Sequence, residues 1–153
     1  MPIPFFACMV AASAAYHLPV HSLPAIQAAE GGYVGAVMPN KDGSHDLGLM
    51  QVNTRWVTPL SRSTGLSPQT VVTRLILDPC FNIVAGAGIL RTYVDEEHGN
   101  VWRAVGDYHS HTAWANTTYK LRVLSEAMKL PPIEAPKPHG HKRHRASEAI
   151  ASD

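Results

Sequence analysis

Charge is scarce in this sequence of 153 residues, because only 16% of them are Asp, Glu, Lys or Arg and the formal net charge is +1. A nearly neutral chain gives no whole-protein argument for a nucleic-acid partner, and we expect none. No apolar run approaches the ~18–20 residues of a membrane span, so we expect no membrane span either. The apolar fraction of 45% is ordinary for a folded protein, and the length suits one domain of roughly 100–200 residues.

Positive charge is missing from the N-terminal region, where the first Lys or Arg is Lys41. The apolar stretch 3–15 therefore lacks the basic region of a secretory signal peptide. It is either a truncated signal segment or the first helix of the fold, and we favour the helix. Cysteine is scarce too: Cys8 and Cys80 would stay thiols in a reducing compartment and could pair in an exported protein. Their spacing alone leaves both states open.

The C-terminal region differs in composition from the rest of the chain. Residues 131–153 contain four prolines, three histidines and four of the 13 basic residues. We interpret residues 1–130 as one domain and 131–153 as a solvated tail. The tail has no aromatic residue to stack on bases, and its histidines have no cysteine partners, so we expect it to bind neither nucleic acid nor a metal.

Apolar spacing, capping residues and prolines predict a mainly helical fold. The expected helices cover residues 5–17, 22–31, 67–77, 78–98, 101–108 and 112–130. The turn signals at 39–43 predict a short β-hairpin within residues 35–55. We expect Ser22 to cap the second helix, and Ser67 and Asp78, each followed by proline, to cap two later ones. A hairpin beside helices would leave a cleft, which is a usual place for a ligand site.

Glu30 is the candidate catalytic residue. It lies in the last turn of the expected second helix, directly before Gly31 and Gly32. The partial negative charge of a helix C-terminus and desolvation by apolar neighbours both raise the pKa of a carboxyl group. A glutamate that stays protonated near neutral pH can donate a proton to a leaving oxygen, which is the acid step of glycosidic bond cleavage.

Four sequence elements occur in an order and spacing that resemble the lysozyme-like lytic transglycosylases of the SLT type. They are Cys8 in the first helix, then Glu30 together with the segment Ser44-His45-Asp46-Leu47-Gly48-Leu49-Met50-Gln51-Val52-Asn53, then Asp78-Pro79-Cys80-Phe81-Asn82-Ile83, and finally Gly106-Asp107-Tyr108-His109-Ser110. The likeness covers about residues 5–130. It is greatest to the branch associated with type IV and type III secretion and conjugation systems. The resemblance implies a lysozyme-like α+β fold that is mainly α, with a small β-hairpin beside the active-site cleft.

The resemblance also implies an activity. A chain of this family would cleave the β-1,4 bond between N-acetylmuramic acid and N-acetylglucosamine in peptidoglycan, with Glu30 performing both proton transfers and a 1,6-anhydro ring as the product. It would act in the periplasm or after export, opening the wall locally for a secretion or conjugation apparatus whose components are candidate partners. No cofactor and no metal are implied. Cys8 and Cys80 fall on positions that the family pairs, which implies a disulfide.

The same resemblance assigns supporting roles around Glu30. Met50 and Gln51 fall on a cleft-lining Met-Gln pair, and Tyr108 on a tyrosine whose hydroxyl reaches the glutamate. Packing in the core is an equal alternative for Met50, and a buried tyrosine with its hydroxyl bonded elsewhere is the alternative for Tyr108. His109 replaces an asparagine found in many relatives, and both can donate a hydrogen bond. Asn53 could bind sugar, but capping the following segment is the interpretation we favour. We expect the three tryptophans, Trp56, Trp102 and Trp114, to lie in the core rather than to serve as sugar platforms.

Two departures from the family pattern leave other functions open. Gly31 follows the glutamate where the family often has a serine that can orient the carboxyl group, so another donor would have to serve. Asp46 lies in a segment similar to c-type lysozymes, which pair a glutamate acid with an aspartate. A hydrolytic muramidase using Glu30 and Asp46 is therefore one alternative, although we favour hydrogen bonds from turn amides to Asp46. A non-catalytic glycan-binding component of a secretion system is another.

Overall fold

The computed structural model describes residues 2–134, and the predicted tail lies almost entirely outside them. The helices are α1 (Phe6–Ala15), α2 (Ser22–Glu30), α3 (Val57–Thr64), α4 (Pro68–Leu77), α5 (Pro79–Glu96), α6 (Val101–His109) and α7 (Ala113–Lys129), with the 3-10 turn η1 (Thr54–Trp56). The strands are β1 (Val37–Pro39), β2 (His45–Leu47) and β3 (Val52–Asn53). The mainly α prediction with a small β element is confirmed.

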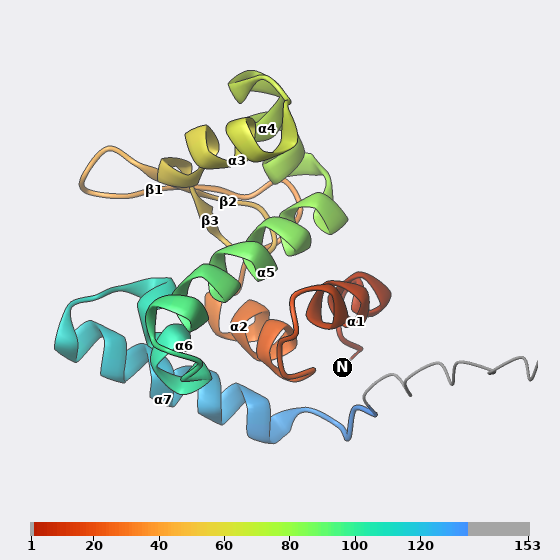
Figure 1. Cartoon of the computed structure of the whole chain (residues 1–153), viewed down its shortest axis with the longest axis vertical. Coiled ribbons are helices and arrows are strands. Elements are labelled where there is room, and N and C mark those ends of the chain that lie inside the picture. Colours follow the sequence, from red (N-terminus) through yellow and green to blue (C-terminus); the bar gives the residue numbers. More distant parts are fainter. Residues whose placement is uncertain (1, 135–153) are drawn as a thin grey trace, which may run out of the picture.

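Helix α5 runs through the centre of the molecule and separates two lobes (Figure 1). On one side of it lie α1, α2, α6 and α7, and on the other lie the sheet, α3 and α4. The sheet has the order β1-β2-β3 and is antiparallel throughout, with Met38 opposite Asp46 and Asp46 opposite Asn53. The β-hairpin predicted within residues 35–55 therefore has a third short strand.

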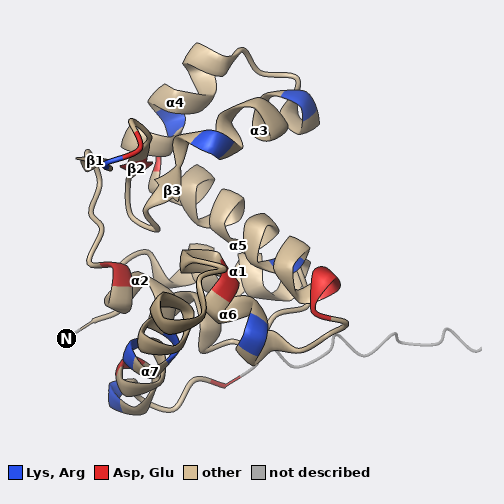
Figure 2. Ribbon diagram, turned by 90° about the vertical axis from the view of Figure 1, so that its left-hand side faces the viewer, with Lys and Arg blue, Asp and Glu red and all other residues tan. Residues whose placement is uncertain are grey.

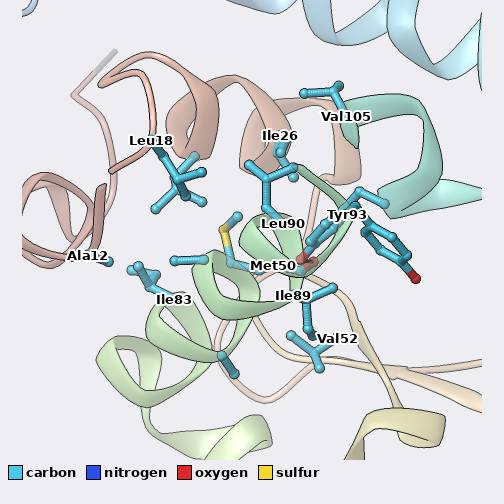
Figure 3. Close-up of a cluster of buried hydrophobic side chains, with 14 of the residues drawn as sticks. Ala12, Leu18, Ile26, Met50, Val52, Ile83, Ile89, Leu90, Tyr93 and Val105 are labelled. Carbon is cyan, nitrogen blue, oxygen red and sulfur yellow. Dashed lines mark hydrogen bonds between the residues drawn. The ribbon is translucent and has the colours of Figure 1, made fainter. Parts of the chain in front are cut away.

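The apolar core forms around α5. Its Ile83, Leu90 and Val94 are at most 2% exposed, and they meet residues of α1, α2 and α6. Figure 3 shows this cluster, with side chains from both lobes converging on the central helix. Because the core extends across both faces of α5, the two lobes are held in a fixed relation to each other.

Helix starts follow the predicted capping chemistry with one exception. The Ser67 hydroxyl accepts a hydrogen bond from the Thr70 amide, and the Asp78 carboxylate accepts one from the Phe81 amide. The prediction for Ser22 is wrong: His21 holds the cap position, and the Ser22 hydroxyl donates to the Pro19 carbonyl at 2.6 Å. The turn from Pro19 to Ser22 brings that carbonyl within reach, because the Ser22 amide also donates to it at 3.0 Å.

Helix α3 was not predicted. Its eight residues carry few large apolar side chains, and Val57 and Leu60 are the ones that pack on the core. The usable signals were Pro59 in the first turn and Gly65 at the C-terminal cap, where φ is 72°.

A disulfide joins Cys8 of α1 to Cys80 in the first turn of α5, with 5.5 Å between the Cα atoms. This pairing confirms the one implied by the family resemblance. It closes a loop across 72 positions of sequence, for which the chain-entropy model gives roughly 4 kcal/mol. Over residues 2–134 no single helix is both long and apolar enough to cross a membrane, and α4 and α5, which would suffice only together, meet at a bend of 107°.

Candidate active site

A cleft of about 360 Å³ lies between the two lobes. Its walls come from the end of α2, the turn between β1 and β2, the strands β2 and β3, and the end of α6. Six of the residues singled out from the sequence line it, namely Glu30, Asp46, Gln51, Asn53, Tyr108 and His109. Positions that are far apart in the sequence thus meet at one site.

Glu30 is the last residue of α2, and the two glycines that follow it set its position. Gly31 ends the helix with φ at 65°, a left-handed conformation that glycine adopts without strain. A Cβ on Gly32 would lie 2.4 Å from the carbonyl oxygens of Gly48 and Leu49, so only glycine lets that segment approach the helix end. The glycines therefore bring the Gly48–Asn53 stretch beside Glu30, and a serine at position 31 would be strained.

The environment of Glu30 raises its pKa from 4.5 to about 7. Burial of the carboxyl group is the largest cause, and the negative charge of Asp46 adds to it. The Tyr119 hydroxyl and the Arg122 guanidinium act in the opposite direction but do not cancel these effects. Glu30 is consequently about half protonated near neutral pH, and it can both donate and accept a proton there.

Asp46 faces the same cleft but is engaged by a neighbour. Its Oδ1 accepts a hydrogen bond of 2.9 Å from the Asn53 side-chain amide, directly across the β2–β3 pair. The expectation that Asp46 accepts from turn amides is wrong, because Asp42 has that role: its Oδ1 accepts from the Ser44 amide and hydroxyl. The turn lies at residues 40–44, where the turn signals predicted it, and β2 carries Asp46 beyond it to the cleft.

Asn53 joins β3 to the following 3-10 turn. Its Oδ1 accepts from the Arg55 amide at 2.9 Å, so the predicted capping role is confirmed. Its Nδ2 donates to the Ser44 hydroxyl and to Asp46, each at 2.9 Å. One amide therefore caps η1 and orients Asp46 in the cleft.

Met50 and Gln51 do not share a role. The Met50 side chain is 0% exposed and lies among the core residues of α5 and α2, so of its two expected places the core is the one observed (Figure 3). Gln51 follows Met50 in a left-handed backbone conformation, with φ at 52°, and its own side chain lies in the cleft wall. There its amide Nε2 donates to the Gly48 carbonyl at 3.0 Å. Gln51 is therefore the member of the pair that a ligand in the cleft can contact.

Tyr108 is buried apart from a small area at the cleft, but its hydroxyl donates to the Met50 carbonyl at 3.1 Å instead of reaching Glu30. The expectation for this hydroxyl is therefore wrong. Tyr108 still lies near the glutamate, whose negative charge contributes to raising the tyrosine pKa after burial, the larger cause. Its role is to hold the Gly48–Asn53 stretch against α6.

The tyrosine beside the Glu30 carboxyl group is Tyr119 of α7, which the sequence reasoning missed. Its hydroxyl is buried and forms no hydrogen bond of ordinary geometry within residues 2–134, yet it is close enough to Glu30 to lower the glutamate pKa. The available signal was helical spacing, since Tyr119 and Val123 are the buried residues of α7. Tyr119 therefore supplies a hydroxyl beside Glu30, which Gly31 cannot do.

His109 covers this tyrosine. The two rings stack with centroids 4.6 Å apart and an angle of 9° between their planes. Burial, and to a smaller extent Arg122, lowers the pKa of His109, so the imidazole is neutral at neutral pH. A second contact fixes the same region, because Asn116 of α7 donates to Asp107 of α6 at 3.0 Å.

Asn82 is a second residue whose role was missed, although it lies inside the Asp78–Ile83 motif. Its side chain accepts from the Met50 amide at 2.7 Å and donates to the carbonyls of Leu47 and Leu75 at 2.8 Å each. All of these groups are buried, so the asparagine ties α5, α4 and the strand region together. In this motif Asp78 caps the helix, Cys80 forms the disulfide and Asn82 anchors the cleft wall.

The expectation that the tryptophans lie in the core is met only in part, and only by Trp56, which packs against the core from the cleft wall. Trp56 is half-buried, lines the cleft and meets the Tyr93 ring edge-on at 5.9 Å between centroids. Trp102 and Trp114 are 43% and 74% exposed, so their predicted place in the core is wrong. Both lie on the outer surface of the helical lobe, on α6 and α7.

A mainly helical domain divided by a long central helix, with a small sheet and a buried glutamate on a cleft between the lobes, is a lysozyme-like domain. The chain belongs to the transglycosylase SLT domain family, whose model matches residues 7–122.

Two relatives extend this comparison. The chain is similar to the invasion protein IagB of Salmonella typhimurium, with 39% identity over 79 residues, which is 52% of this chain and 46% of IagB. It is also similar to protein IpgF of Shigella flexneri, with 32% identity over 120 residues, which is 78% of this chain and 75% of IpgF. The match to IagB thus spans about half the length of that protein.

Proposed function

We propose that this protein is a peptidoglycan lytic transglycosylase that uses Glu30 as its acid and its base. The observation that carries the proposal is the state of this carboxyl group: it lies in the cleft between the lobes with a pKa of about 7. A group with that pKa has both of its protonation states available near neutral pH. Membership of the SLT family supports glycan strands of peptidoglycan as the substrate.

In the first step protonated Glu30 gives its proton to the oxygen that links N-acetylmuramic acid C1 to N-acetylglucosamine. The bond from C1 to that oxygen breaks, and the N-acetylglucosamine portion leaves with the proton. Positive charge develops at C1, and the negative charges of Glu30 and Asp46 beside the cleft stabilise it.

In the second step the Glu30 carboxylate takes the proton of the muramic acid C6 hydroxyl. The C6 oxygen then bonds to C1 and closes the 1,6-anhydro ring, so water is not consumed and Glu30 is protonated again. General acid and base assistance each contribute about 10²–10⁴-fold. The largely buried position of Glu30 supports this course, because exclusion of water favours transfer of the proton between Glu30 and the bound glycan rather than to solvent.

A hydrolytic muramidase is the second candidate, because Asp46 lines the same cleft and its charge acts on Glu30. In that reaction water would attack C1 and leave a reducing end. Membership of the SLT family favours the transglycosylase, whereas the hydrogen bond from Asn53 to Asp46 is compatible with both reactions.

Mass analysis of the muropeptides released from purified sacculi separates the two reactions. We expect 1,6-anhydromuramyl ends, which are lighter by one water than the hydrolytic product. Reducing ends alone, together with an inactive Asp46→Asn variant, would assign the protein to the hydrolases. Binding to sacculi without any release of fragments would instead support a glycan-binding component.

We further propose that the protein acts in the periplasm or after export, where it opens the wall locally for a secretion or conjugation apparatus. The disulfide supports an oxidising compartment, and the likeness to an invasion protein supports a secretion context. Thiol labelling of the denatured, unreduced protein from its native compartment tests the location. We expect neither cysteine to react, and full labelling would contradict export.

A further inference from the structure

Helix α7 has an exposed apolar stripe on the side that faces away from the domain. Its buried face carries Tyr119 and Val123, which are 1% and 5% exposed. The stripe on the other side consists of Trp114 at 74%, Leu121 at 58%, Leu124 at 44% and Met128 at 79% exposure. Single exposed apolar residues are common, but four of them on one side of one helix are not explained by chance exposure.

The spacing of the stripe is that of a helix–helix seam. Trp114, Leu121 and Met128 are seven residues apart, and Thr117 and Leu124 fill the intermediate positions, so the pattern alternates steps of three and four. This narrow stripe is typical of a helix that packs along a second helix, whereas a face that lies on a membrane is broader. The seam runs for about 21 Å, given a rise of about 1.5 Å per residue.

The borders of the stripe are positively charged. Lys120 lies on one border, where its ammonium group is 5.5 Å from the Trp102 ring centroid, and Arg122 and Lys129 lie towards the other. Figure 2 shows Lys and Arg along α7. The one acidic residue of this helix, Glu126, is paired with Lys129 at 2.8 Å. The chemistry complementary to this surface is therefore an apolar stripe bordered by carboxylates.

We infer that the exposed side of α7 docks an amphipathic helix of another protein, whose apolar heptad stripe is flanked by Asp and Glu. A second copy of this chain would bring two faces of the same charge together. The segment 137–145 that follows α7 is not complementary either, because it holds four basic residues and no acidic one. This surface is separate from the cleft, since the side of α7 that approaches Glu30 is the one with Tyr119.

Two synthetic helical peptides test the inference. Each has three heptads with Leu at positions a and d, and the flanking positions e and g are all Glu in one peptide and all Lys in the other. Each carries a fluorescent label, and the full chain is titrated into it while anisotropy is recorded. We expect the Glu peptide to bind about tenfold more tightly than the Lys peptide or better, and its binding to weaken with added salt.

Variants of exposed leucines locate the binding surface. Leu121→Glu places a carboxylate in the stripe, and we expect it to weaken binding of the Glu peptide about tenfold or more. The matched control is Leu77→Glu on α4, because Leu77 is 61% exposed and lies in the other lobe. This control should bind as the wild type does. Met128→Glu is a second stripe variant in case Leu121→Glu lowers the melting temperature.

Charge reversal adds an independent measurement. Lys120→Glu should reduce the preference for the Glu peptide. Equal affinity for both peptides, or full affinity in both stripe variants, would overturn the inference. So would binding to vesicles of phosphatidylglycerol and phosphatidylcholine without peptide binding, which would identify a membrane surface. Self-association that Leu121→Glu abolishes would identify a second copy and also overturn it.

Discussion

Replacing Glu30 with Gln should stabilise the protein at alkaline pH while it abolishes cleavage. The folded protein holds a proton on Glu30 up to a pKa of about 7, whereas the reference value is 4.5. Between these two pH values the folded state binds more protons than the unfolded state, so the free energy of unfolding falls as pH rises. Glutamine has nearly the shape of the protonated side chain and does not incur this penalty.

The size of the effect follows from the pKa shift. A shift of about 2.5 units at about 1.4 kcal/mol per unit corresponds to about 3 kcal/mol. We therefore expect wild type and variant to differ little below about pH 4.5, and the variant to be more stable by about 3 kcal/mol above about pH 8. For a chain of this size that is a rise of roughly 6–12 °C in melting temperature.

Equilibrium denaturation of both proteins at a series of pH values, with the disulfide intact, measures this difference. The matched control is Glu96→Gln, because Glu96 is an exposed glutamate near the end of α5. It should not reproduce the gain. A stability difference between wild type and Glu30→Gln that stays constant from pH 4.5 to 8 would refute the reasoning about burial. Turbidity clearing of sacculi by the variant at the wild-type rate would refute the catalytic role.

The remaining predictions concern the neighbours of Glu30 and the frame that holds them. Asp46→Asn should keep cleavage activity but shift the alkaline limb of the pH–rate profile to lower pH, because the charge that raises the Glu30 pKa is removed; an unshifted limb would contradict this. Tyr119→Phe should shift the same limb to higher pH, because the nearby hydroxyl lowers the Glu30 pKa, and an unshifted limb would contradict this. It should change stability by less than about 1 kcal/mol, since the hydroxyl forms no hydrogen bond of ordinary geometry within residues 2–134. Asn82→Ala should cost about 3 kcal/mol or more in a denaturant titration, because it leaves three buried backbone groups unpaired. Reduction of the disulfide should lower the free energy of unfolding by roughly 4 kcal/mol, because the unfolded chain is then no longer restrained by the closed loop. An unchanged denaturation midpoint after reduction would contradict this prediction.

Most helices, and the caps at which they begin or end, could be predicted because their signals are local. Ser67 and Asp78 satisfy backbone amides that lie three residues ahead, so their effect does not depend on the rest of the chain. Gly31 ends α2 for the same kind of reason. Ser22 misled the prediction because a nearer carbonyl, that of Pro19, competes for its hydroxyl, and only the path of the chain before α2 makes this carbonyl available.

The family, the helix boundaries at strong caps and the cleft glutamate could be predicted from the sequence, and the cysteine pair followed from the family resemblance. What each side chain near that glutamate does depends on how the chain folds. Met50 and Gln51 are adjacent, yet a left-handed turn at Gln51 leaves one in the core and brings the other to the cleft. Tyr119 approaches Glu30 from a helix far along the chain, and burial by both lobes sets the glutamate pKa. Local spacing cannot predict these features, because desolvation and contact depend on segments that meet only after folding.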